Sequence, residues 1–146
     1  MRYENRYIAT VCICAFCIFI IGIGESKSQS SDRNNRENEL ENKILQTAKQ
    51  INSQLPIMVD KETRLDTVIA TGKQFHYKYT MVNLTEKEIN KKEFLSYAKS
   101  HLVKNHCGND DIKKMLKVGV SYDYVYQDKK GNLIGSVIIK RNSCGL

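Results

Sequence analysis

Hydrophobic residues follow a helical spacing in one segment of the chain, between residues 40 and 55. Leu40, Ile44, Ala48, Ile51 and Leu55 recur at intervals of four, four, three and four residues. This spacing places all of these side chains on one side of a helix. Pro56 follows directly, and the residue before a proline is disfavoured in the helical region. The pattern predicts an amphipathic helix of about 18 residues that ends before Pro56.

Two later segments alternate with the period of two that is typical of strands. The first begins at Thr63 and turns at Gly72 and Lys73, and the second turns in the stretch DKKGN before a Val/Ile-rich return from Leu133 to Lys140. The alternating residues are Leu65, Thr67, Ile69, Phe75, Tyr77, Tyr79 and Met81 in the first segment, and Val120, Tyr122, Tyr124 and Tyr126 in the second. Each segment predicts a β-hairpin with one apolar face.

Helical signals fill the interval between the two hairpins. Thr85 and Glu88 have the spacing of a capping box, which opens a predicted helix that continues to His106. Gly108 ends this helix, and Asp110 is placed to cap a short third helix. The order helix, hairpin, two helices, hairpin predicts an α+β domain, in which an antiparallel sheet of two hairpins packs against helices.

The N-terminal residues have the pattern of an export signal. Residues 8–24, IATVCICAFCIFIIGIG, carry no charge, follow Arg2 and Arg6, and precede the polar stretch ESKSQSS. Such a run lies between the core of a signal peptide and the roughly 20 residues of a membrane-spanning helix. We interpret residues 1–24 as a signal peptide or N-terminal membrane anchor, 25–36 as a polar tether, and 37–146 as a single extracytoplasmic domain. This domain would be periplasmic, secreted or anchored at the inner membrane.

Two of the five cysteines, Cys107 and Cys144, lie outside the apolar run. An even number in an oxidising compartment favours a disulfide, and two unpaired thiols are the alternative. With His101 and His106 these cysteines lack the paired spacing of a metal site, so no metal ligand is assigned. No Gly-rich phosphate loop, nucleophile elbow or dinucleotide fingerprint occurs in the sequence, and no cofactor is predicted.

The net charge of +7 at pH 7 favours anionic partners. The lysines are spread along the chain without a dense basic tract. This distribution favours a solvated surface over a nucleic-acid interface, so nucleic acid is not the expected partner.

Two groups of residues are candidates for binding a partner. The first comprises Tyr77, Tyr79, Tyr122 and Tyr124, at strand spacing in the two hairpins. Alternating aromatic residues usually form core or cross-strand pairs, but on an uncovered face they would line a binding surface. The second group is Arg64 and Asp66, which are two apart in a strand and therefore share a face. This pair can bind each other or a partner.

The stretch LPIMVDKETRLD at residues 55–66, the strand FHYKYTMVN and a late cysteine near the turn GNLIG resemble a family of small exported bacterial proteins of unknown function. The resemblance covers residues 40–146. It implies a protein of the bacterial envelope and supplies no catalytic residue.

These observations favour a non-enzymatic exported or membrane-tethered domain that binds another envelope or extracellular protein, as an accessory, inhibitor or immunity factor. An uncleaved leader would add the membrane as a partner. One alternative is a small secreted basic hydrolase, such as a nuclease, that uses His76, Lys78 and Asp66. The other alternative is a structural component of the envelope.

Overall fold

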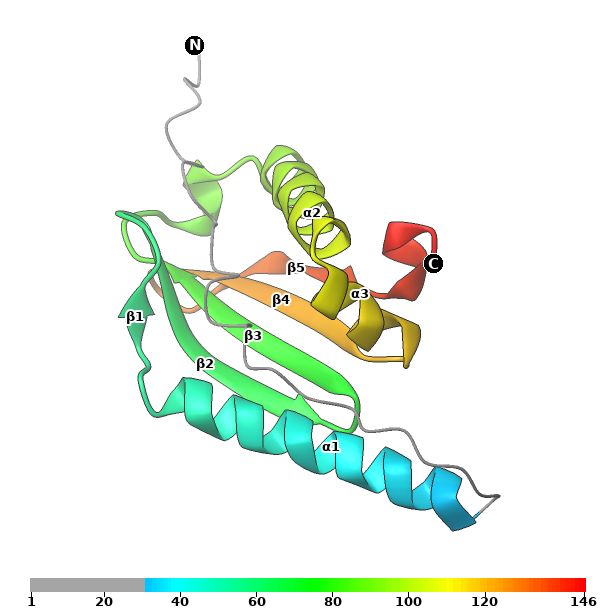
Figure 1. Ribbon diagram of the computed structural model, residues 1–146. Coiled ribbons are helices and arrows are strands. Elements are labelled where there is room, and N and C mark those ends of the chain that lie inside the picture. The colour runs from blue at the N-terminus through cyan, green and yellow to red at the C-terminus, as the bar shows by residue number, and fades with distance from the viewer. Residues whose placement is uncertain (1–30) are drawn as a thin grey trace.

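A five-stranded sheet with helices packed on one of its faces forms the molecule (Figure 1). The computed structural model describes residues 31–146. The elements are α1 (Ser31–Asn52), β1 (Ile57–Met58), β2 (Thr63–Thr71), β3 (Gln74–Met81), α2 (Lys91–Gly108), α3 (Asp110–Lys117), β4 (Ser121–Asp128) and β5 (Leu133–Ile139), with short 3-10 helices η1 (Glu86–Glu88) and η2 (Arg141–Cys144). The predicted α+β class and the predicted order of helices and hairpins are confirmed.

The strands lie in the order β1-β2-β3-β4-β5. Both predicted hairpins, β2–β3 and β4–β5, are antiparallel. The hairpins join through β3 and β4, which run parallel. The sheet is therefore mixed rather than wholly antiparallel, because α2 and α3 return the chain to the end of the sheet where β3 begins. The short strand β1 was not predicted, and it pairs with the start of β2.

Helix α1 buries the predicted stripe against the first hairpin. Ile44, Ala48 and Ile51 are all buried. The helix begins at Ser31, so residues 31–36 of the segment that we interpreted as a polar tether are helical. Two ion pairs lie in the polar part of the helix that follows: Glu39 pairs with Lys43 one turn later, and Glu37 pairs with Lys73 in the β2–β3 turn. The leader at 1–24 and the rest of the tether, 25–30, lie outside the described residues.

Two helix starts differ from the sequence prediction. The carboxylate of Glu88 accepts the N–H of Thr85 at 2.7 Å, as in the predicted capping box, but this box opens only η1. The cap of α2 is Asn90, and the cap of α3 is Asn109 rather than Asp110. Asn109 Oδ1 accepts the N–H groups of two residues in the first turn of α3. Asparagine suits this position because its side chain reaches the unpaired donors of a helix start.

A fully buried carboxylate, Asp128, holds η1 against the β4–β5 turn. It accepts the backbone N–H groups of Glu86, Lys130 and Asn132 and the side-chain amide of Asn132. Burial alone would raise the pKa of Asp128, but these four hydrogen bonds outweigh burial and hold the pKa far below its usual range. Asp128 therefore stays charged and fixes the segment that leads from β3 to α2.

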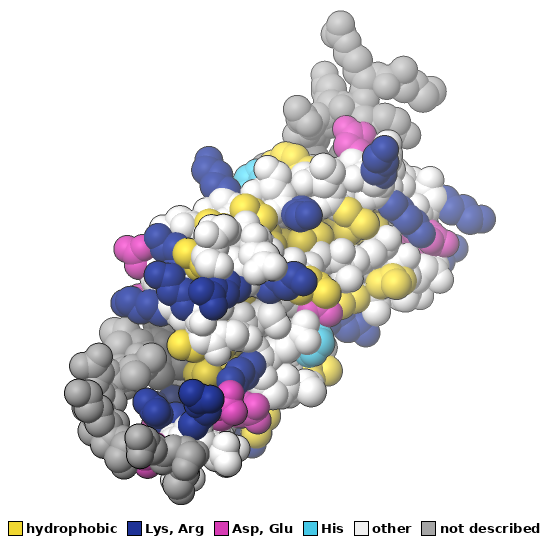
Figure 2. All heavy atoms as spheres, turned by 90° about the vertical axis from the view of Figure 1, so that its right-hand side faces the viewer, with side chains coloured by type: hydrophobic (Ala, Val, Ile, Leu, Met, Phe, Trp, Pro, Cys, Tyr) yellow, Lys and Arg dark blue, Asp and Glu magenta, His cyan; other side chains and the backbone are white. Residues whose placement is uncertain are grey.

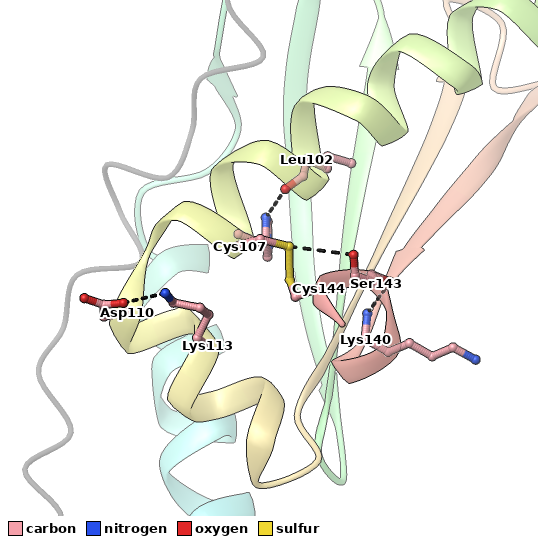
Figure 3. Close-up of a disulfide and its surroundings, with 8 residues drawn as sticks. Leu102, Cys107, Asp110, Lys113, Lys140, Ser143 and Cys144 are labelled. Atoms are coloured by element: carbon pink, nitrogen blue, oxygen red, sulfur yellow. Dashed lines mark hydrogen bonds and ion pairs between the residues drawn. A yellow bond between two sulfur atoms is a disulfide. The ribbon is translucent and has the colours of Figure 1, made fainter. Parts of the chain in front are cut away.

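The predicted disulfide is present between Cys107 and Cys144 (Figure 3). Their Cα atoms are 5.4 Å apart, and 37 positions separate them in the chain. The bond joins the end of α2 to η2, directly after the last strand. It therefore ties the helical layer to the C-terminal end of the sheet.

Replacing Cys107 and Cys144 together with serine should lower the free energy of unfolding by about 4 kcal/mol, because the unfolded chain regains the entropy that the closed loop removes. Urea unfolding of the wild type and of C107S/C144S, each with and without reductant, measures the difference. The double variant should be insensitive to reductant. A wild type whose unfolding midpoint is the same in reductant would contradict a stabilising disulfide.

Candidate functional site

The four candidate tyrosines lie in the core. Tyr77, Tyr79, Tyr122 and Tyr124 are at most 5% exposed. The parallel register places Tyr77 beside Tyr124 and Tyr79 beside Tyr126, with ring centroids 5.0 and 5.4 Å apart. A tyrosine-lined surface open to a partner is therefore not present among the described residues, and the core interpretation of these residues holds. The reason is that the helices cover the aromatic face of the sheet.

A buried histidine on α2 anchors one of these tyrosines. His106 is 1% exposed, and its Nδ1 lies 2.8 Å from the carbonyl of Leu102. A carbonyl can only accept, so Nδ1 carries the proton and Nε2 is left as the acceptor. The hydroxyl of Tyr124 lies 2.8 Å from that Nε2 and donates to it. Burial lowers the pKa of His106, against a smaller opposing effect of the Leu102 hydrogen bond, so the imidazole stays neutral.

The opposite face of the sheet carries the exposed side chains of the strands. Register places Ile69, His76, Asp123 and Ile138 in one row across β2, β3, β4 and β5. The next row contains Thr67, Lys78, Val125 and Ser136. Ile69 and Ile138 at the two ends of the first row are 56% and 49% exposed. We call these two rows the open face.

His76 and Asp123 form an ion pair or hydrogen bond at the centre of the open face. Nδ1 of His76 lies 3.2 Å from Oδ2 of Asp123, and Oδ1 of Asp123 is buried without a hydrogen-bond partner among the described residues. Sequence reasoning missed Asp123, although its alternation with the tyrosines of β4 identifies its face. The hydrolase alternative placed His76 with Asp66, and the structure does not bring those two side chains together.

Arg64 and Asp66 bind each other, as their shared face predicted. Nε of Arg64 lies 2.6 Å from Oδ1 of Asp66, and Thr80 donates its hydroxyl to the other carboxylate oxygen at 2.5 Å. Asp66 sits at an irregularity in the β2–β3 register, between Leu65 and Thr67. The pair therefore closes a β-bulge, which is a structural role. Nearby, Asp60 accepts two backbone N–H groups at 2.7 Å and shapes the turn into β2.

The remaining surface has mixed chemistry. On the side seen in Figure 2, Lys and Arg side chains occur in several groups, with hydrophobic and acidic side chains between them. Across residues 31–146, no cluster of His, Cys, Asp and Glu is arranged to hold a metal ion. Within the same residues, no helix is both long and apolar enough to cross a bilayer.

The family model of the type II secretion system (T2SS) pilotin, S protein, matches residues 36–144. This chain belongs to the T2SS pilotin family. The match runs from α1 to the end of η2 and includes both cysteines of the disulfide. The resemblance to small exported bacterial proteins was therefore correct in kind, but the family has a role in secretion rather than an unknown function. T2SS pilotins are exported envelope proteins, consistent with an extracytoplasmic, non-enzymatic accessory protein.

Three solved structures share the fold of this T2SS pilotin family member. EpsS, the type 2 secretion system pilotin of Vibrio vulnificus, is 17% identical with a TM-score of 0.61, and the alignment covers 77% of this chain and 98% of that one. AspS, the T2SS pilotin of Vibrio cholerae, is 20% identical with a TM-score of 0.58 and the same coverage. A protein of Pseudomonas aeruginosa, described as a candidate secreted protein, is 15% identical with a TM-score of 0.63, covering 75% and 96%. No curated protein sequence matches the chain.

Tyr124→Phe should lower the free energy of unfolding by about 1–3 kcal/mol, because it leaves Nε2 of His106 buried without a donor. Tyr126→Phe is the matched control on the same strand, since the Tyr126 hydroxyl is buried with no partner among the described residues. That control should change stability by less than about 0.5 kcal/mol or raise it. Urea unfolding measures both, and equal losses in the two variants would contradict the His106–Tyr124 bond.

The stability of the protein should also depend on pH through His106. Below the ordinary value of 6.5, the unfolded chain binds a proton at His106 that the folded protein does not, since its folded pKa is lowered. Stability should therefore fall as the pH decreases from 6.5 through the folded pKa. Unfolding free energies from pH 8 to 5 should show a flatter profile in His106→Gln than in His101→Gln, the control on the same helix. An equal loss of pH dependence in the two variants would contradict the assignment of this effect to His106.

Proposed function

We propose that this chain acts as the pilotin of a type II secretion system, an exported accessory protein that binds the secretin of that system. The observation that carries the proposal is the extent of the family match. It covers residues 36–144, which is nearly all of the described region 31–146 and not a single helix or strand. The two Vibrio pilotins support it, because the alignments cover 98% of each of those chains. Function follows here from the whole domain and not from a local motif.

The uncharged run at residues 8–24 and the disulfide support export of the domain. We assign residues 1–24 as the leader, either cleaved or kept as an anchor, and the following residues as the part that acts outside the cytoplasm. The disulfide is consistent with that location, because such bonds persist in oxidising compartments.

The open face is the surface we assign to the protein partner. Its rows combine exposed apolar side chains at the edges, Ile69 and Ile138, with a cation, Lys78, and a polar centre. Protein interfaces combine apolar contacts with hydrogen-bonding and charged groups, and the open face supplies both kinds of group. Within residues 31–146, helices and core side chains cover the opposite face, and the open face carries the exposed side chains of the strands.

The test is co-expression of the full chain with an affinity-tagged secretin of the same secretion system, followed by purification from solubilised membranes. The wild-type chain should co-purify with the secretin. Ile69→Asp combined with Ile138→Asp should reduce the recovered chain at least about tenfold, because carboxylates would then enter an apolar contact. Leu45→Asp is the matched control, since Leu45 is an exposed apolar residue on α1.

The outcomes test the pilotin function and the role of the open face separately. A wild-type chain that does not co-purify with the secretin would overturn the pilotin assignment. Unchanged recovery of the Ile69/Ile138 variant would move the contact to another surface and leave the function standing. Thermal unfolding of both variants serves as the check that each has folded.

A further inference from the structure

The two edges of the sheet differ in how their backbone groups are bonded. At the first edge, β1 pairs with the start of β2. Further along that edge, the side-chain amide of Asn52 binds both backbone groups of Val68: Oδ1 accepts the N–H at 2.8 Å, and Nδ2 donates to the carbonyl. The amide of Asn52 thus occupies the place of a neighbouring strand. This edge is closed by the chain itself.

The second edge, formed by β5, has no such cover within residues 31–146. β5 is the last strand in the sheet and pairs only with β4. The one side-chain hydrogen bond to its backbone in that region runs from Lys91 to the carbonyl of Leu133. Its sequence, LIGSVII, contains neither a charged residue nor a proline. Proteins usually protect a free strand edge with charged residues or proline. Because β5 has neither, it has the properties of a strand that accepts a neighbour.

A bulge restricts the available length of this edge. Tyr126 pairs with Gly135 and Gln127 with Leu133, so the register shifts at Ile134. Gly135 has a φ of +159°, and a Cβ there would lie 2.5 Å from Leu95 of α2. Helix and strand are therefore in close contact at the bulge. The regular part of β5 is residues 136–139, where Ser136 and Ile138 are exposed and Val137 and Ile139 face the core.

Basic residues stand at both ends of β5. Lys129 and Lys130 precede it in the turn, and Lys140 and Arg141 follow it. A second copy paired antiparallel about Ser136 would bring Lys140 and Arg141 of each copy to the lysine-bearing turn of the other. Like charges placed across a strand pair are destabilising. The charge distribution therefore disfavours a dimer through β5 and favours a partner strand with acidic ends.

We propose that β5 is an acceptor for an extended segment of a partner protein, uncharged in its centre and acidic at both ends, which adds as a sixth strand. Backbone hydrogen bonds to residues 136–139 supply the pairing, and the flanking lysines and arginine select the acidic ends. This site lies at the strand edge and does not depend on which protein occupies the open face. It holds whether or not the chain binds a secretin.

The probe is a synthetic peptide of alternating Val and Thr with two Asp residues at each end, titrated into the isotope-labelled full chain. Amide NMR shifts should concentrate in residues 136–139, and hydrogen exchange of the amides in this part of β5 should slow. A peptide with Lys in place of Asp should bind at least about tenfold more weakly, because its ends meet like charges. The affinity for the Asp peptide should fall as salt rises.

Charge reversal provides the matched variants. Lys130→Glu with Lys140→Glu should invert the preference, so that the Lys peptide binds better than the Asp peptide. Lys49→Glu with Lys117→Glu makes the same change in net charge on α1 and α3, and should keep the wild-type preference. The proposal is overturned by no β5 shifts at millimolar peptide, by shifts centred on Ile69 and His76, by equal binding of both peptides, or by a chain that dimerises through β5.

Discussion

The parallel contact between β3 and β4 determines how the rest of this molecule is arranged. Each hairpin is a local structure, but an isolated hairpin has only marginal stability. Stacked aromatic pairs join the two hairpins in register: Phe75 with Tyr122, Tyr77 with Tyr124, and Tyr79 with Tyr126. Because this pairing is parallel, the chain must travel back along the sheet between the two strands. Helices α2 and α3 provide that path, and they cover the aromatic face as they do so.

Much of the fold could be predicted from local patterns, since alternation and helical spacing depend on neighbouring residues. The hairpins and the stripe of α1 belong to this group. The Cys107–Cys144 bond was predicted differently, from an even number of cysteines in an exported domain. The parallel junction could not be predicted, because alternation shows which residues share a face and not which strands are neighbours. The two-residue strand β1 is too short to produce a periodic signal.

The candidate site was harder to predict for a related reason. The tyrosines and the residues between them, His76 and Asp123 among others, alternate equally well, so the sequence separates two faces without showing which one the helices cover. The His76–Asp123 contact crosses from β3 to the neighbouring β4, and only the unpredicted junction brings these residues together. Arg64 and Asp66 were recognisable because they lie on the same strand and need no knowledge of strand order. The link to secretion comes from the family match over the whole domain, and no single residue indicates it.

The disulfide also sets the time at which the domain is completed. Thiols stay reduced in the bacterial cytoplasm, so a newly made chain lacks the bond between α2 and η2 until it reaches an oxidising compartment. Before that point the folded domain lacks the stabilisation that the closed loop provides. After export, oxidation makes the folded state the more persistent one. A bond that joins two distant parts of the chain thus couples the maturation of the domain to its arrival outside the cytoplasm.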